Sequence, residues 1–111
     1  MYARLTTYRY AVGDQSAVDA ADPEATGQEV LRLLTDQEGC RGAWMCAPQD
    51  SQTETVFFSL WDTQEQAEAA GDRARPGMLA VLERSQTQLT APPEARVLVV
   101  EAAADRTGAA T

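Results

Sequence analysis

Few side chains in this sequence are suited to chemistry, and the most suggestive of them alternate along the first segment. Residues 2–10 follow a period of two, so one face of an expected strand carries five of them: Tyr2, Arg4, Thr6, Tyr8 and Tyr10. A guanidinium beside phenol groups can hold an aromatic ligand that carries oxygen. Either Arg4 or Tyr8 would then stabilise the negative charge that develops on a phenolate or enolate. The alternative is that tyrosine is simply a good strand former and that Arg4 pairs with a surface carboxylate, which suits Tyr2 and Tyr10 better.

The residue types that are missing narrow the chemistry further. The chain contains no His, Lys, Asn or Ile. Without His or Lys it has no Ser–His or Cys–His nucleophile pair, no imidazole ligand for a metal or haem, and no lysine for a Schiff base. The 17 acidic residues are scattered singly, with no pair on one strand that suggests general acid–base work. We therefore expect neither a metal site nor a cofactor.

Two cysteines, Cys40 and Cys46, lie in one expected strand. At about 3.3 Å per residue, their separation along that strand is roughly 20 Å. A disulfide needs Cα atoms within about 7 Å, so these two cannot form one, and the same distance excludes a shared metal ion. Both are expected to be buried free thiols, which agrees with a cytoplasmic protein.

Charge and hydropathy limit the partners. The formal net charge of −8 at pH 7 repels phosphate backbones and anionic lipid headgroups, so nucleic acid and membrane partners are disfavoured. No run approaches the roughly 20 apolar residues that span a bilayer. Met1 leads directly into the alternating segment, without a signal-like apolar stretch. A cytoplasmic location is expected.

The secondary structure around the first strand can be predicted from the spacing of apolar residues and from residues that typically begin or end helices and strands. That strand is expected to end at Gly13-Asp14. Asp22-Pro23 then supplies an N-cap and a proline at the first helical position. In the helix that follows, residues at spacings of three and four form a stripe that faces a sheet, namely Gly27, Val30, Leu31 and Leu34. This helix is expected to stop near Gly39.

The middle of the chain predicts an antiparallel hairpin. Two short apolar runs, 40–47 and 54–61, flank a cluster of turn formers at 48–52. If the second run turns its odd residues toward the helices, strand parity points Val56, Phe58 and Leu60 to the opposite face.

A second helix is expected after this hairpin, because Thr63 to Gln66 has the capping-box arrangement. We expect the helix to break between Gly71 and Gly77. It then resumes with apolar residues at helical spacing, namely Met78, Leu79, Val81, Leu82 and Leu89, and ends at Pro92-Pro93. The run 96–100 predicts a last strand with both faces buried.

The element order is β-α-β-β-α-β, the split βαβ plan of an α+β ferredoxin-like sandwich with helices on one face of an antiparallel sheet. We expect one domain over residues 1–101 and a flexible tail over 102–111. The core is thin, since 20 residues are Ala and only 22 are Val, Leu, Met or Phe. The bare sheet face needs a cover, and a second copy of the chain is the simplest one, which predicts a homodimer.

Over nearly the whole chain, from Met1 to about Glu101, the sequence resembles the antibiotic-biosynthesis-monooxygenase family of dimeric α+β barrels. The resemblance rests on the order and spacing of several passages: Tyr2 to Tyr8 with Gly13 after it, Glu38 to Ala43, Ser59 to Ala67, and Pro92-Pro93-Glu94. It implies a homodimer whose protomers each hold a pocket between sheet and helices. Enzymatic members oxidise aromatic, quinol-like substrates with molecular oxygen and no metal or flavin, and one branch degrades haem.

The resemblance also implies site residues. A Trp at the end of the third strand faces the pocket in this family, and Trp61 stands at that position. Strand parity then places Phe57 and Ser59 beside it. An Asn on the first strand usually assists the Trp, and here Thr6 occupies roughly its place. The haem branch needs a His ligand, which this chain lacks, so haem degradation is disfavoured.

Each of these aromatic residues has a purely structural alternative. Trp61 either lines the pocket or packs under the helices, and Trp44 is a further candidate for the pocket lining. Two functions therefore remain open. One is a cofactor-independent oxygenase for a small aromatic or polyketide-type substrate, with Trp61, Arg4 and Tyr8 as catalytic residues and with substrate-binding residues Thr6, Phe57, Ser59 and Trp44. The other is a non-catalytic dimeric module that binds a small ligand or serves only as a stable barrel.

Overall fold

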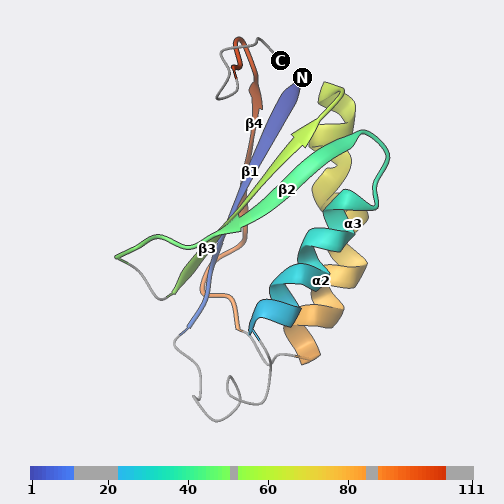
Figure 1. Cartoon of the computed structure of the whole chain (residues 1–111). Coiled ribbons are helices and arrows are strands. Elements are labelled where there is room, and N and C mark those ends of the chain that lie inside the picture. Colours follow the sequence, from blue (N-terminus) through green and yellow to red (C-terminus); the bar gives the residue numbers. More distant parts are fainter. Residues whose placement is uncertain (12–22, 51–52, 85–87, 105–111) are drawn as a thin grey trace.

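The computed structural model describes residues 1–11, 23–50, 53–84 and 88–104. These contain four strands and two helices: β1 (Tyr2–Arg9), α2 (Pro23–Thr35), β2 (Cys40–Cys46), β3 (Glu54–Trp61), α3 (Gln64–Arg84) and β4 (Glu94–Val99). The strands form one antiparallel sheet in the order β2-β3-β1-β4, and both helices lie against the same side of it (Figure 1). The predicted βαββαβ ferredoxin-like α+β fold is therefore confirmed.

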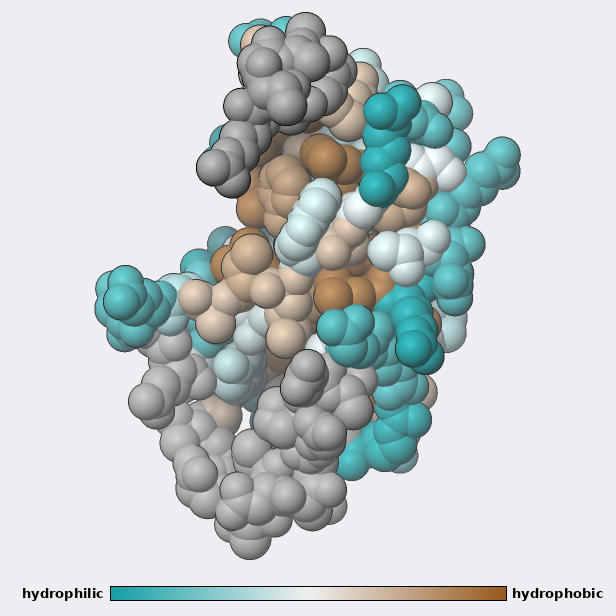
Figure 2. All heavy atoms as spheres, in the orientation of Figure 1, coloured by the Kyte–Doolittle hydropathy of each residue, from teal (hydrophilic) through white to brown (hydrophobic). Residues whose placement is uncertain are grey.

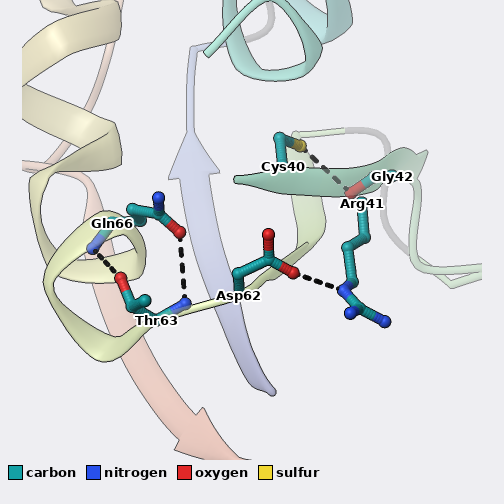
Figure 3. Close-up of polar contacts among 6 residues, drawn as sticks. All are labelled: Cys40, Arg41, Gly42, Asp62, Thr63 and Gln66. Carbon is teal, nitrogen blue, oxygen red and sulfur yellow. Dashed lines mark hydrogen bonds and ion pairs between the residues drawn. The ribbon is translucent and has the colours of Figure 1, made fainter. Parts of the chain in front are cut away.

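The second helix begins as the sequence predicts. The backbone N–H of Gln66 donates to Thr63 Oγ1 at 3.2 Å, and the backbone N–H of Thr63 donates to Gln66 Oε1 at 3.1 Å (Figure 3). This reciprocal capping box satisfies two N–H groups that the first helical turn leaves without partners. Just before it, the Arg41 guanidinium bonds Asp62 Oδ1 at 2.5 Å and ties the start of β2 to the end of β3. The other predicted cap, Asp22, lies outside the described residues, as does Gly13-Asp14.

The expected break in this helix is wrong, because α3 runs unbroken through Gly71, Pro76 and Gly77. The two glycines allow close approach. A Cβ on Gly71 would collide with the Arg4 guanidinium, and one on Gly77 would lie 2.5 Å from Leu33 Cδ2. Packing against β1 and α2 thus outweighs the poor helix propensity of this stretch. Leu89 is also not helical, since it forms an isolated bridge with Tyr10 after α3 has ended.

The core lies between the sheet and the helices. It consists of Val30, Leu34, Phe57, Trp61, Ala67, Ala70 and Val81. Phe57, Ser59 and Trp61 are all buried, whereas Val56, Phe58 and Leu60 are only partly buried on the other side of β3. The predicted parity of this strand is therefore confirmed.

The last strand differs from the sequence prediction. It spans Glu94–Val99 instead of 96–100, and Leu98 and Val99 are 37% and 58% exposed. The reason is its place in the sheet: β4 is an edge strand that pairs only with β1. An apolar run therefore does not show by itself that both of its faces are buried.

The side of the sheet away from the helices, here called the open face, is largely apolar. The register places Ala3, Leu5, Trp44, Val56, Phe58, Leu60 and Leu98 on it. The rings of Trp44 and Phe58 lie 5.6 Å apart. In Figure 2 apolar residues gather over the strands, whereas hydrophilic residues predominate on the side of the helices.

The structure also bears on the predictions about the cysteines, the C-terminal tail and membrane-spanning segments. Both cysteines are free, but only Cys40 is partly buried, and Cys46 is exposed on the open face, so the expectation that both are buried is wrong. Residues 105–111 of the expected tail lie outside the described residues. In the part of the chain that the structure describes, neither helix combines the length and the hydropathy that crossing a membrane requires.

Candidate functional site

A cavity of about 340 Å³ lies between the helix side of β1 and the two helices. Residues just before and within β4 also line it, among them Pro93 and Ala95. Its lining is mostly apolar, with Val30, Leu33, Leu34, Phe57, Met78 and Leu82 prominent. Five side chains bring polarity to it: Arg4, Thr6, Tyr8, Asp72 and Arg75. Three of these five come from the alternating face of the first strand, so the structure brings together the residues that the sequence singled out there.

Arg4 is held against α3 by neutral oxygens. Its Nη1 donates to the carbonyl of Ala67 at 3.0 Å and to that of Glu68 at 3.3 Å, and its Nε donates to Thr6 Oγ1 at 3.3 Å. Among the described residues no carboxylate lies within 4.0 Å of this guanidinium, in contrast to the arginines that form surface ion pairs. The alternative that Arg4 pairs with a surface carboxylate therefore does not match the described contacts.

The electrostatic surroundings of Arg4 reflect this arrangement. Burial lowers the pKa of Arg4, while Tyr8 and Asp72 act in the opposite direction. The group stays charged at neutral pH, because an arginine starts from a very high pKa. A positive charge in a mostly apolar cavity can stabilise negative charge on a ligand more strongly than it could in water.

Tyr8 lies farther along the same face of β1. Its ring packs edge-on against Phe57, with centroids 5.6 Å apart and planes at 86°. Among the described residues no protein group bonds its hydroxyl. Burial raises the pKa of Tyr8, and the nearby Arg4 and Arg75 lower it by less. The phenol is therefore protonated at neutral pH and is available to donate a hydrogen bond into the cavity.

Asp72 and Arg75 lie on α3 at the cavity and form an ion pair with each other at 3.4 Å. Both side chains are largely exposed, at 83% and 70%. The sequence analysis missed them because it expected a helix break at this point. A continuous helix would have placed Gly71, Asp72 and Arg75 on one side at spacings of one, three and four, which is the signal that could have found them.

Neither tryptophan is among the residues that line this cavity, although the sequence analysis named both as candidates for its lining. Trp61 is 0% exposed, does not line the cavity, and donates its Nε1–H to Ser59 Oγ at 2.8 Å. Ser59 is 2% exposed beside it. Trp44 is 48% exposed on the open face, because its partner in the register is Phe58 and not an odd-numbered residue of β3. Of the five other candidates, four line the cavity: Arg4, Thr6, Tyr8 and Phe57.

The cavity suits a small, flat, apolar ligand that carries oxygen atoms. Its volume falls within the range of small-molecule sites, and its few polar groups are spaced along one strand. Within the described part of the chain, no three Cys, Asp or Glu side chains gather as a metal site would require. The arrangement can bind an aromatic ring between Phe57 and the helices and stabilise an anion at Arg4.

Comparisons with protein-family models and with curated proteins found no match to this sequence. Solved structures, in contrast, match most of the chain. SnoaB, a cofactor-independent oxygenase from Streptomyces nogalater, is 14% identical, with a TM-score of 0.59 over 90% of this chain and 93% of that one. A structure described as an antibiotic biosynthesis monooxygenase is 10% identical, with a TM-score of 0.65 over 90% and 98% of the two chains.

A protein from Mycobacterium tuberculosis is also similar, with 18% identity and a TM-score of 0.61 over 89% of this chain and 93% of that one. At such identities the likeness concerns the fold. The order of the strands, the two helices on one face and the coverage agree with the family that the sequence resembles. The chain is thus an α+β ferredoxin-like domain with the fold of the antibiotic biosynthesis monooxygenase structures.

Proposed function

We propose that this protein is a cofactor-independent oxygenase for a small aromatic or polyketide-type substrate, and that it works as a cytoplasmic homodimer. The observation that carries the proposal is the cavity beside β1, in which Arg4 presents a positive charge with no described carboxylate within 4.0 Å. SnoaB, which shares the fold, is a cofactor-independent oxygenase, and this supports the same class of reaction here.

The proposed reaction needs no reductant besides the substrate. An activated CH₂ group between aromatic rings loses a proton to water and becomes an enolate, whose oxygen Arg4 stabilises. The enolate carbon transfers electrons to O₂ and forms a C–O bond, giving a hydroperoxide once a proton is taken up. Loss of water then leaves a carbonyl. In sum, CH₂ and O₂ give C=O and H₂O, so one oxygen atom enters the product and the other leaves as water.

The residues of the cavity divide this work. Arg4 lies nearest the developing negative charge, and Thr6 holds its Nε in place. Tyr8 donates a hydrogen bond to a second oxygen of the substrate, because its phenol stays protonated. Phe57 packs on the ring system. Trp61 and Ser59 act from beneath this layer by keeping β3 in place.

The test is oxygen consumption with a panel of anthrones and hydroquinones. We expect turnover by the unaltered protein and a loss of about 100-fold in Arg4→Ala, the size typical for removal of one stabilising group. Arg41→Ala is the matched control, because Arg41 pairs with Asp62 on the surface and does not line the cavity. Equal rates in both variants would remove Arg4 from the reaction.

The second candidate is a non-catalytic dimeric module, and one observation favours it. The indole of Trp61 is fully packed, so the residue that the family resemblance implicates does not reach the cavity. If the unaltered protein consumes no oxygen above background with any substrate and binds none of them, this second function replaces the first.

A further inference from the structure

The guanidinium of Arg4 lies half-buried at the cavity and forms no ion pair with a described carboxylate. Its three described hydrogen bonds go to two backbone carbonyls and one hydroxyl, all of them neutral. Buried or half-buried charges in proteins are ordinarily paired with an opposite charge. Here the nearest acidic residue of the cavity, Asp72, is bound to Arg75 instead. Arg4 therefore has no acidic side chain as its partner among the described residues.

The guanidinium also has donors left to use. Nε and Nη1 make the three described bonds, and among the described residues nothing accepts a bond from Nη2. Nη2 lies directly against the Cα of Gly71, where a side chain would occupy the same space. A glycine at this place in α3 therefore creates the room in which Nη2 sits at the edge of the cavity.

The other residues of the cavity indicate the shape and polarity of the rest of the ligand. Its wall is apolar and includes the ring of Phe57, so the body of the ligand is apolar and flat. Tyr8 lies four residues beyond Arg4 on β1, which separates their Cα atoms by about 13 Å. An acidic group and a second oxygen at opposite ends of a fused ring system would match these two positions.

We infer that the cavity selects aromatic ligands that carry an ionised carboxylate, which binds the Nη2 group of Arg4 where Gly71 makes room for it. This inference rests on the proposed function in one respect only: it uses the same cavity as the ligand site. It adds that the substrate is an aromatic acid: its carboxylate binds Arg4 at Nη2 before any reaction begins, and the enolate oxygen of the proposed reaction meets the same guanidinium later. Gly71 is then a positioning residue: it has no side chain, and this allows the Arg4 guanidinium to take its position at the cavity.

The test compares two probes of equal size, 2-naphthoate and its neutral amide, by calorimetric titration of the full chain at neutral pH. We expect the carboxylate to bind at least about tenfold tighter, since a hydrogen bond to a charged group is worth about that much. In Arg4→Gln this preference disappears while binding of the amide is unchanged. Gly71→Ala gives the same loss of preference without removing the charge, and it keeps the assay informative if Arg4→Gln fails to fold.

Arg75→Gln and Arg41→Gln serve as controls. Arg41→Gln removes a cation outside the cavity and is expected to keep the preference. Arg75→Gln removes the other cation of the cavity wall and shows whether the preference depends on that residue instead. Equal affinities of the two probes for the unaltered protein would overturn the inference, and so would a preference that depends on Arg75 and not on Arg4.

The outcome is separable from that of the proposed oxygenase. Oxygen consumption that is equally fast with neutral and acid-bearing anthrones would leave the oxygenase standing and refute the selection of acids. A carboxylate preference that depends on Arg4, together with no oxygen consumption, would support the inference and refute the oxygenase.

Discussion

At the scale of single residues, the two tryptophans differ in solvent exposure. Their neighbours in the sequence do not reveal this difference. Trp61 is 0% exposed and its indole N–H satisfies Ser59, which is itself buried. Trp44 lies on the open face and is about half exposed. The first is therefore packed inside the core, and the second lies at the surface on the open face.

We predict that Trp61→Phe lowers the free energy of unfolding by about 1–3 kcal/mol. Phenylalanine leaves a small cavity, and the buried Ser59 hydroxyl loses its donor. Urea unfolding followed by circular dichroism measures the change, with Met45→Leu as the control because that side chain is 45% exposed and lies off the open face. If Trp61→Phe instead unfolds like the unaltered protein while oxygen consumption is lost, Trp61 belongs to the site after all.

A second residue-level prediction concerns pH. Burial raises the pKa of Tyr8, so the unfolded chain loses this proton at lower pH than the folded protein does. The contribution of Tyr8 to stability is therefore complete below the ordinary tyrosine pKa of about 10 and is lost as pH rises toward the folded value. We expect the free energy of unfolding to fall less steeply above that pH in Tyr8→Phe. Parallel pH profiles of the two proteins would contradict this.

At the scale of elements, α3 shows tertiary contacts overriding local preference. Pro76 lacks the N–H that would donate to the carbonyl four residues earlier, at Asp72, yet the helix continues through it. Gly71 and Gly77, which resemble helix breakers in the sequence, are sites of contact with Arg4 and Leu33. The helix persists because it packs on the sheet and on α2.

We therefore predict that Pro76→Ala stabilises the protein by about 1–3 kcal/mol, because it restores a helical hydrogen bond at an exposed position. The measurement is the shift in urea midpoint at unchanged slope. Pro92→Ala is the control, since Pro92 is exposed and lies outside both helices, and its effect should stay below about 1 kcal/mol. A destabilised Pro76→Ala protein would mean that the proline ring itself makes a needed contact.

At the scale of the whole molecule, the sheet has two unequal faces. One is covered by α2 and α3, and the other presents Leu5, Trp44 and Phe58 without any described element over them. Arg96 lies opposite Leu5 on this face, and the apolar patch beside it is typical of an interface. The same face on a second copy would cover it symmetrically.

We predict a homodimer with twice the 12.0 kDa mass of one chain, measured by light scattering at micromolar concentration. Phe58→Asp should disrupt the dimer and the fold together, because an unpaired carboxylate buried at this interface costs several kcal/mol. Ala80→Asp, on the exposed side of α3, should leave the mass unchanged. A single-chain mass for the unaltered protein, or an intact dimer of Phe58→Asp, would refute the assignment of this face.

Local signals in the sequence were enough to predict the element order, the capping box, the parity of β3 and three cavity residues on β1. Each of these depends on near neighbours in the chain: a period of two, a hydroxyl three residues before an amide, a turn between two apolar runs. The fold class followed from that order because few topologies accommodate it.

Only the tertiary structure decided where the cavity lies and which side chains reach it. Arg4 meets Ala67 and Glu68 across the fold, and Asp72 and Arg75 join the site only because α3 continues past Gly71 and lies over β1. Trp61 points to the correct face but is covered completely, which no periodicity can reveal. Alternation determines the side of a sheet on which a residue lies, whereas depth beneath that side depends on the packing of segments far apart in the chain.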